Sequence, residues 1–325
     1  MNDLAAFRDV FADVTPWSGE NPDGFLVDFM GTLTDVEFRL DFGGDRAAAK
    51  PRHVTTELPV IGDGSNGEGW FEAVNWVEAA REARDHFVMI TLGACYGAQA
   101  VGAYRAIQMI NPMPCRLVLV EPEPDNCQWI ARHLRDNGID PEKQWIVPFA
   151  ISNKTDPVLF PVGSPGTGAQ NCFSTNEQAS RKVYADQLIK GGDPAEALRN
   201  LLLHNTTGIT KDLVPGRNFN AEIKVVSAIT LKELLGPFDV VDFLESDIQQ
   251  SEILVFPPFI DLLAKKVRRI HIGTHGAETH DTLHKLFKDH GWEIIFSYAP
   301  NAVHKSALGT FELNDGILTV RNPDL

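Results

Sequence analysis

The order of apolar and polar residues changes near residue 70 and divides the chain into two parts. Residues 24–40 alternate apolar and polar positions, which predicts a pair of short strands. Residues 70–86 are rich in Ala and Glu and contain neither Gly nor Pro, so they predict a helix. Up to that helix the chain is irregular and rich in Gly, Pro and Asp. We therefore expect residues 1–70 to form an N-terminal extension with short strands.

Buried strands and helices alternate regularly from residue 87 onward. Continuous apolar runs of about 4–8 residues are typical of parallel strands that are covered on both faces. Such strands, separated by helices of about 10–15 residues, indicate a right-handed parallel α/β sheet. Strands are expected at 87–92, 116–121 and 144–151, and helices at 97–110 and 125–138.

The alternation is interrupted at 153–220 and then resumes. We interpret the interruption as an insertion over the sheet, either a substrate-facing lid or a variable segment. Asn314-Asp315-Gly316 lies between two apolar runs and predicts a hairpin turn, so the last strand should be antiparallel. Residues 71–325 are expected to form one α/β domain. The resumed elements are strands at 238–246, 267–275 and 292–299, two apolar runs joined by the turn within 309–322, and helices at 249–265 and 282–291.

Composition narrows the classes of partner. A formal net charge of −15 disfavours nucleic acid, whose binding relies on Lys and Arg. The four cysteines show no CxxC pairing, so we expect neither a disulfide framework nor a thiolate zinc site, and a reduced cytoplasmic location is the default. The sequence shows no signal-peptide pattern and no apolar run long enough to span a bilayer. A small-molecule partner is expected, with no nucleic acid and no membrane; the oligomeric state stays open.

A glycine-containing turn follows the first buried strand, at the edge of the sheet where ligands bind. It holds Gly93 and Gly97, and glycines let a backbone turn tightly and approach a ligand. Glu121 ends the second strand, near the position at which an acidic residue binds ribose hydroxyls in nucleotide-binding sheets. No basic residue lies in the turn, which disfavours a pyrophosphate. S-adenosylmethionine fits this combination; packing glycines and a solvated carboxylate are the structural alternative.

Four segments in series carry a resemblance to a known family. They are MITLGACYGAQAVGA (89–103), VLVEPEPDNCQWIARHLRDNG (118–138), TLKELLGPFDVVDFLESDIQQSE (230–252) and RRIHIGTHG (268–276). Together they resemble the FkbM-type S-adenosylmethionine-dependent methyltransferases, and more closely an uncharacterised bacterial branch. The resemblance implies a Rossmann-like class I methyltransferase sheet, mostly parallel with an antiparallel final strand and helices on both faces. It also implies methyl transfer to a hydroxyl of a sugar, polyketide or similar small metabolite.

The resemblance assigns contacts with the cofactor, S-adenosylmethionine. Matching positions are Thr91, Gly93, Ala94, Gly97, Glu121 and Ala150. The turn residues would face the cofactor backbone, Glu121 would bind the ribose hydroxyls, and Ala150 would lie near the adenine. Three positions depart from the family pattern. Thr91 replaces an acid that often holds the amino group of the methionine part, and Cys95 and Gln250 each replace a glycine.

Half of the ten histidines lie within 271–290. His275 follows the expected strand at 267–275 and should lie close to Asp247, which ends the neighbouring strand. Histidine titrates near neutral pH, so the working hypothesis makes His275 the general base, with Asp247 or Glu252 orienting it or the substrate. His271 is alternatively a hydrogen-bonded core histidine. The remaining three, interpreted as solvated helix positions, are His280, His284 and His290.

Two other classes of function stay open. A divalent cation could bind between His275, Asp247 and Glu252, and tight metal binding in the histidine window would serve a metal-dependent hydrolase, although no metal is expected. His280 and His284 could form a helical zinc pair, but the HExxH pattern and a nearby third ligand are missing. Alternatively the chain binds S-adenosylmethionine without catalysis, which the departures at Thr91 and Gln250 favour. The sequence determines neither the acceptor nor whether oxygen or nitrogen is methylated.

Overall fold

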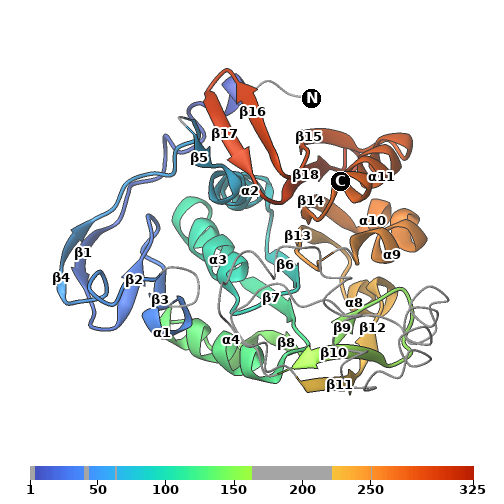
Figure 1. Cartoon of the computed structure of the whole chain (residues 1–325), viewed down its shortest axis with the longest axis horizontal. Coiled ribbons are helices and arrows are strands. Elements are labelled where there is room, and N and C mark those ends of the chain that lie inside the picture. Colours follow the sequence, from blue (N-terminus) through green and yellow to red (C-terminus); the bar gives the residue numbers. More distant parts are fainter. Residues whose placement is uncertain (1–3, 40–43, 63, 163–221, 250) are drawn as a thin grey trace, which may run out of the picture.

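A seven-stranded sheet forms the centre of the computed structural model, which describes residues 4–39, 44–62, 64–162, 222–249 and 251–325 (Figure 1). Neighbouring strands are parallel except at β18, which is antiparallel to the strand on either side. The predicted Rossmann-like α/β sheet, mostly parallel with an antiparallel final strand, is confirmed. Its order is β15 (Glu293–Tyr298), β18 (Gly316–Arg321), β14 (Val267–Thr274), β13 (Val241–Ser246), β6 (Phe87–Leu92), β7 (Cys115–Val120) and β8 (Trp145–Val147).

The strand order reverses beside β6. Strands β7 and β8 follow it on one side, and β13 and β14 lie on the other. In open α/β sheets, ligands bind at such a switch point, outside the carboxyl ends of the strands. A ligand site is therefore expected at the carboxyl ends of β6, β7 and β13.

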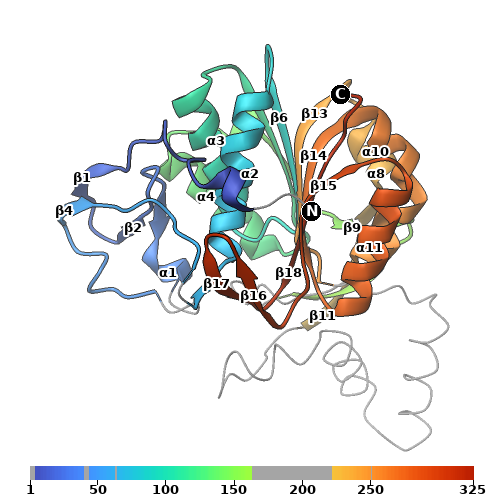
Figure 2. The same ribbon diagram turned by 90° about the horizontal axis from the view of Figure 1, so that it is seen from above.

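Helices cover both faces of the sheet, as predicted (Figure 2). One face packs against α2 (Glu68–Glu82), α3 (Ala98–Ile110) and α4 (Pro124–Asp136). The opposite face packs against α8 (Leu231–Leu235), α9 (Glu252–Val255), α10 (Ile260–Lys266) and α11 (Ala277–Asp289). On β6, Met89 belongs to the first core and Ile90 to the second, so all six residues of the strand are buried. This two-sided burial explains its continuous apolar run.

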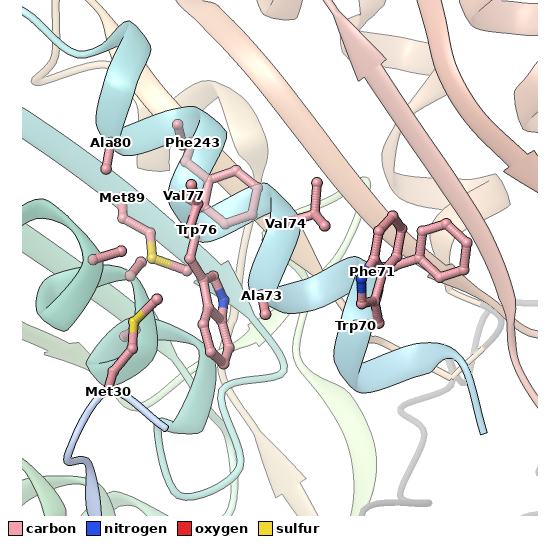
Figure 3. Close-up of a cluster of buried hydrophobic side chains, with 14 of the residues drawn as sticks. Met30, Trp70, Phe71, Ala73, Val74, Trp76, Val77, Ala80, Met89 and Phe243 are labelled. Carbon is pink, nitrogen blue, oxygen red and sulfur yellow. The ribbon is translucent and has the colours of Figure 1, made fainter. Parts of the chain in front are cut away.

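Helix α2 packs tightly against α3, and its buried side chains form much of the hydrophobic cluster in Figure 3. Phe71 and Val74 on α2 are fully buried, and Trp76 lies against α3. A Cβ at Gly102 of α3 would lie 2.6 Å from the Trp76 ring, so glycine there permits the close approach of the two helices.

Two predicted elements are interrupted, in each case at proline. The third strand was expected at 144–151, but β8 ends before Pro148, and β9 (Ala150–Ile151) instead pairs with β12 (Ala228–Ile229). The helix expected at 249–265 is divided by the 3-10 turn η4 (Pro257–Phe259) into α9 and α10. Proline lacks the N–H that would continue either hydrogen-bond pattern.

The predicted hairpin at Asn314-Asp315-Gly316 is wrong. Strand β17 (Gly309–Leu313) pairs with β16 (Ala302–Ser306) and β5 (Ser65–Asn66) rather than with β18. Strand β18 lies between β14 and β15, so both of its edges are already occupied. The antiparallel direction was right, but its partners are β14 and β15.

Short strands occur in the N-terminal part, including the predicted pair within residues 24–40. These are β2 (Phe25–Val27) and β3 (Leu33–Asp35), followed by the one-turn helix α1 (Val36–Arg39). Strand β1 (Ser18–Asn21) pairs with β4 (Arg52–Thr55), and the turn η1 (Leu4–Phe7) buries Leu4 in the first core. The domain division at residue 70 stays a prediction.

Strand β10 (Val158–Val162) lies within the expected insertion at 153–220 and pairs antiparallel with β11 (Glu222–Val226), which follows it. Most of the segment predicted as an insertion or lid, and Gln250, lie outside the described residues. The remaining short element is η3 (Pro141–Lys143). Within the described part of the chain, no helix combines the length and apolarity that a membrane crossing requires.

Candidate functional site

A cavity of about 350 Å³ lies at the carboxyl ends of β6, β7 and β13, beside the switch point. Its volume falls within the range of small-molecule pockets, about 300–1,000 Å³. Among the residues that the structure describes, the sequence-predicted Gly93, Ala94, Glu121, Ala150 and Asp247 line it, whereas Thr91, Gly97, His275 and Glu252 do not. The predicted site residues thus form two groups: some line the cavity, and the others lie behind its wall.

The glycine turn is shaped by close contact between the ends of β6 and β13. Gly93 has φ +76°, and a Cβ there would lie 2.0 Å from the carbonyl oxygen of Asp247. Gly97 has φ +86° and begins α3. The N–H groups of Gly93 and Ala94 both donate to Val120 O, at 3.0 Å. Any side chain at Gly93 would therefore clash with the backbone that follows β13.

Backbone amides hold the carboxylate of Glu121 at the end of β7. Its Oε2 accepts from the N–H of Cys95 at 2.7 Å, and its Oε1 accepts from the N–H of Glu123 at 2.8 Å. The side chain is 4% exposed. Burial raises the pKa of Glu121 to about 7, although both backbone hydrogen bonds favour the ionised form. An acidic group is thus fixed where the sequence predicted it.

Ala150 lines the same cavity from a different strand than expected. It belongs to β9 rather than to the third strand of the main sheet, and its N–H donates to Ser227 O at 3.0 Å. Its small side chain, with the neighbouring Ile151 and Phe160, forms an apolar section of the wall.

The rest of the cavity is acidic. Its lining carboxylates are Glu68, Glu72, Glu121, Glu245 and Asp247. Arg39 at the end of α1 is the one basic side chain among the described lining residues, and its Nη1 lies 3.4 Å from the hydroxyl of Tyr96 in the glycine turn. Sequence reasoning found Glu121 and Asp247 but missed Glu68, Glu72 and Arg39, because it placed neither α1 nor α2 over the strand ends. It also missed Glu245 on β13.

Glu72 is the α2 carboxyl best suited to proton exchange. Burial raises its pKa to about 7, the charge of Glu68 adds to the rise, and a hydrogen bond from Gln99 opposes it. A group with a pKa near 7 exchanges protons efficiently at neutral pH. In the sequence, Glu72 resembles an ordinary surface residue of an amphipathic helix.

Thr91 and Glu245 lie opposite each other on neighbouring strands behind the glycine turn. They are register partners between β6 and β13. Thr91 is 1% exposed and Glu245 is 3% exposed. Neither Thr91 Oγ1 nor Glu245 Oε2 has a hydrogen-bond partner within the described part of the chain. The signal for Glu245 was present in the sequence as one acidic residue near the end of an apolar strand.

His275 lies behind the cavity, in a cluster of carboxylates. Its Nδ1 is 2.9 Å from Glu252 Oε1, and its Nε2 is 3.2 Å from Asp247 Oδ1 and 3.6 Å from Asp315 Oδ1. His275 and Glu252 are buried, whereas the side chain of Asp247 is half-exposed. The predicted proximity of these three residues is therefore present, but only Asp247 reaches the cavity.

The charges around His275 favour its protonated form. Burial alone would lower its pKa, but the charge of Glu252 and hydrogen bonds with Asp247 and Glu252 hold the pKa well above the usual value. The amide nitrogen of Gln249 lies 2.7 Å from Nε2, a contact that suits a neutral ring. We favour the protonated ring because Glu252 is wholly buried and needs a charged partner. In either form, both ring nitrogens are occupied.

The other histidines of the window are structural. His271 is a buried core histidine, with Nδ1 2.8 Å from Thr319 Oγ1 and 3.0 Å from Asn75 Nδ2. His280 was predicted to be solvated, but it is buried between Thr274 Oγ1 and Ser297 Oγ. The prediction failed because α11 begins at Ala277 and turns this position toward the sheet. His284 is half-buried, and His290 is exposed as predicted.

No described group of three or more His, Cys, Asp and Glu side chains has an arrangement that could hold a metal ion. Among the described carboxyls that line the cavity, Glu72 and Glu121 have raised pKa values.

Comparisons with known proteins give similarity at the level of solved structures. No family model and no curated protein matches the chain. The methyltransferase FkbM from Methylobacillus flagellatus KT is similar with 12% identity and a TM-score of 0.41, over 74% of this chain and 45% of that one. The chain thus spans less than half of the FkbM chain that it matches.

Two further similar structures are also methyltransferases. A precorrin-6y C5,15-methyltransferase from Geobacter metallireducens GS-15 has 11% identity and a TM-score of 0.38, over 81% of this chain and 98% of that one. An O-methyltransferase from Bacillus cereus in complex with SAH has 11% identity and a TM-score of 0.36, over 89% of this chain and 91% of that one. Identity and TM-score are low throughout, so the function is inferred below from the chain's own geometry.

Proposed function

We propose that the protein is an S-adenosylmethionine-dependent methyltransferase that acts on a hydroxyl of a sugar, polyketide or similar small metabolite. The observation that carries the proposal is the joint presence, around one cavity, of the Gly93 turn and the buried carboxylate of Glu121. These groups lie at the switch point of a sheet with the strand order β15-β18-β14-β13-β6-β7-β8. The FkbM-type assignment belongs to the same proposal.

The lining residues fit the parts of this cofactor. Glu121 would accept hydrogen bonds from the ribose hydroxyls, and Ala150 and Ile151 would contact the adenine. Glycine at position 93 lets the end of β6 lie directly against the carbonyl oxygen of Asp247, which shapes this part of the cavity wall. Oε2 of Glu245 has no hydrogen-bond partner among the described residues, which leaves a buried acceptor for a cationic group. No lysine and one arginine occur among the described lining residues, which favours a ligand without a pyrophosphate.

When bound, the cofactor would supply an electrophilic methyl group, and the chain would supply orientation and a proton acceptor. Asp247 is half-exposed at the cavity and is fixed from behind by His275, at 3.2 Å. We assign Asp247 to acceptor binding and Glu72 to proton removal from the acceptor hydroxyl. His275 becomes a positioning residue in place of the base that the sequence hypothesis made it, because both of its nitrogens are occupied and it does not line the cavity.

Equilibrium dialysis with radiolabelled S-adenosylmethionine tests the proposal. S-adenosylhomocysteine should compete for the site, and ATP and NAD should not. Incubation of the loaded protein with a panel of sugars, phenolic polyketides and amines should transfer label to hydroxyl compounds. Labelling of amines alone would correct the acceptor class, and absence of S-adenosylmethionine binding would refute the proposal.

A second candidate is a protein that binds the cofactor without catalysis. Thr91, in place of the family acid, is the observation that favours it, because a threonine cannot neutralise a cationic group. Tight binding without transfer to any acceptor in the panel would support this alternative.

A further inference from the structure

The position that lacks the expected acid has an acidic neighbour on the next strand. Thr91 on β6 pairs in register with Glu245 on β13. Register partners in a sheet project from the same face, and adjacent strands lie about 4.8 Å apart. The preceding pair on this face, Met89 and Phe243, is buried in the core beneath α2. Glu245 therefore brings a carboxylate close to the place where a side chain longer than Thr91 would put one.

Glu245 also carries the signs of an incomplete site. It is 3% exposed and lines the cavity, and its buried Oε2 has no hydrogen-bond partner within the described ranges of the chain. Buried polar atoms in proteins are nearly always hydrogen-bonded, so such an atom at a cavity wall calls for a donor from a ligand. The other cavity carboxylates are already engaged. Glu68 accepts from the N–H groups of Asn314 and Asp315, and Glu121 accepts from two backbone amides.

We propose that Glu245 binds the ammonium group of the cofactor's methionine part and so takes the place of the acid that Thr91 lacks. This assignment rests on the proposed function. It makes Glu245 the anchor for the amino-acid end of the ligand, opposite Glu121 at the ribose end. It also removes the main sequence argument for a non-catalytic protein, because the missing charge is supplied from the neighbouring strand.

The surroundings of Glu245 make this contact sensitive to protons. Burial raises its pKa well above the usual value, and the charges of Asp247 and Glu72 raise it further. On the other side, its register partner His271 is held neutral by burial, which lowers the pKa of His271 to about 4. The empty site thus favours a neutral carboxyl at Glu245. An incoming ammonium favours the ionised form, so its binding should release a proton.

Calorimetric titration of the full chain with two ligands tests the proposal. The ligands are S-adenosylhomocysteine and its deaminated analogue, which keeps the carboxylate but lacks the ammonium. The wild-type protein should prefer S-adenosylhomocysteine by about 10- to 100-fold, as a charged hydrogen bond in a buried site allows. In Glu245→Gln that preference should fall below about 3-fold, while affinity for the deaminated analogue stays the same.

Matched variants distinguish the loss of the Glu245 charge from a general loss of structure at the site. Glu68→Gln changes another lining carboxylate that already has backbone partners, and it should keep the wild-type preference. The double variant T91E/E245Q returns the acid to the family position and should regain the preference. Equal loss of affinity for both ligands in Glu245→Gln, or no regain in a folded double variant, would overturn the assignment.

A measurement on the unaltered protein avoids dependence on the folding of variants. Titrations in buffers of different ionisation enthalpy should show net proton release with S-adenosylhomocysteine and less release with the deaminated analogue. Equal proton release for the two ligands would contradict the role of Glu245. If wild-type protein binds the two ligands equally, Glu245 is not the ammonium site although the proposed function stands. If it binds neither, the proposed function fails as well.

Discussion

At the end of β7 the carboxylate of Glu121 is held by two backbone N–H groups, whereas at the ends of β6 and β13 Thr91 and Glu245 each bury an oxygen without a partner in the described part of the chain. The first region is complete before any ligand arrives. The second is incomplete and strongly charged, with Asp247 and Glu72 close to Glu245. Under the proposed function, the ribose end of the cavity would be preorganised, and the amino-acid end would be completed by the ligand.

The largest effect on ligand binding should come from Gly93, where the two regions meet. Gly93→Ala places a Cβ 2.0 Å from Asp247 O at φ +76°, so either the turn or the end of β13 must shift. We expect affinity for S-adenosylhomocysteine to fall by more than about 100-fold, or about 3 kcal/mol, in isothermal calorimetry. Gly69→Ala is the control, because nothing lies within 4 Å of its Cβ. Tight binding by Gly93→Ala would show that the contact between the strand ends is dispensable.

Removing His275 should lower the stability of the fold, because it disturbs the charged region. His275→Ala leaves the wholly buried Glu252 without its charged partner, which should lower the free energy of unfolding by about 3–5 kcal/mol. His290→Ala, at an exposed position, should change it by less than about 0.5 kcal/mol. Urea denaturation measures both variants. Wild-type stability combined with a loss of turnover of about 10²–10⁴ would instead identify His275 as the general base.

A smaller effect should appear in the pH dependence of stability at Glu121. Its pKa is raised from 4.5 in the unfolded chain to about 7 in the fold, so its contribution to stability is present below pH 4.5 and lost as pH rises to 7. Relative to Glu121→Gln, the wild-type free energy of unfolding should decline across this window by about 3 kcal/mol. Parallel curves for the two proteins, in urea denaturation without ligand, would show that Glu121 stays ionised in the empty site.

The smallest effect should be on cofactor affinity at the preorganised end. Glu121→Ala removes the proposed acceptor for the ribose hydroxyls and should weaken S-adenosylhomocysteine binding by about 1–3 kcal/mol. Adenosine, which has the same ribose, should lose a similar amount. Unchanged affinity for both ligands in calorimetry would remove Glu121 from the site.

The sequence predicted the sheet well because its strands are buried on both faces and appear as continuous apolar runs, as at 87–92. The residues after these strands were placed correctly for the same reason, and Gly93, Glu121 and Asp247 line the cavity. Pairing between distant strands was not predictable in this way. The hairpin prediction failed because β14 and β15 occupy both edges of β18.

The chemistry of the site depends on contacts that no local pattern reveals. Glu245 was not recognised as a candidate because its role depends on register pairing with Thr91, which lies more than a hundred residues away along the chain. Glu72 reaches the cavity because α2 packs tightly against α3, through Trp76 and Gly102. His275 was expected as a base from its residue type, but the surrounding carboxylates fix both of its nitrogens.

Calorimetric titration of the purified protein with S-adenosylhomocysteine, with and without EDTA, tests the central claim most directly. A cavity built from the Gly93 turn and Glu121 predicts binding with a Kd on the order of micromolar, unaffected by EDTA. Absence of heat at any concentration, or binding that EDTA abolishes, would contradict the proposed methyltransferase site.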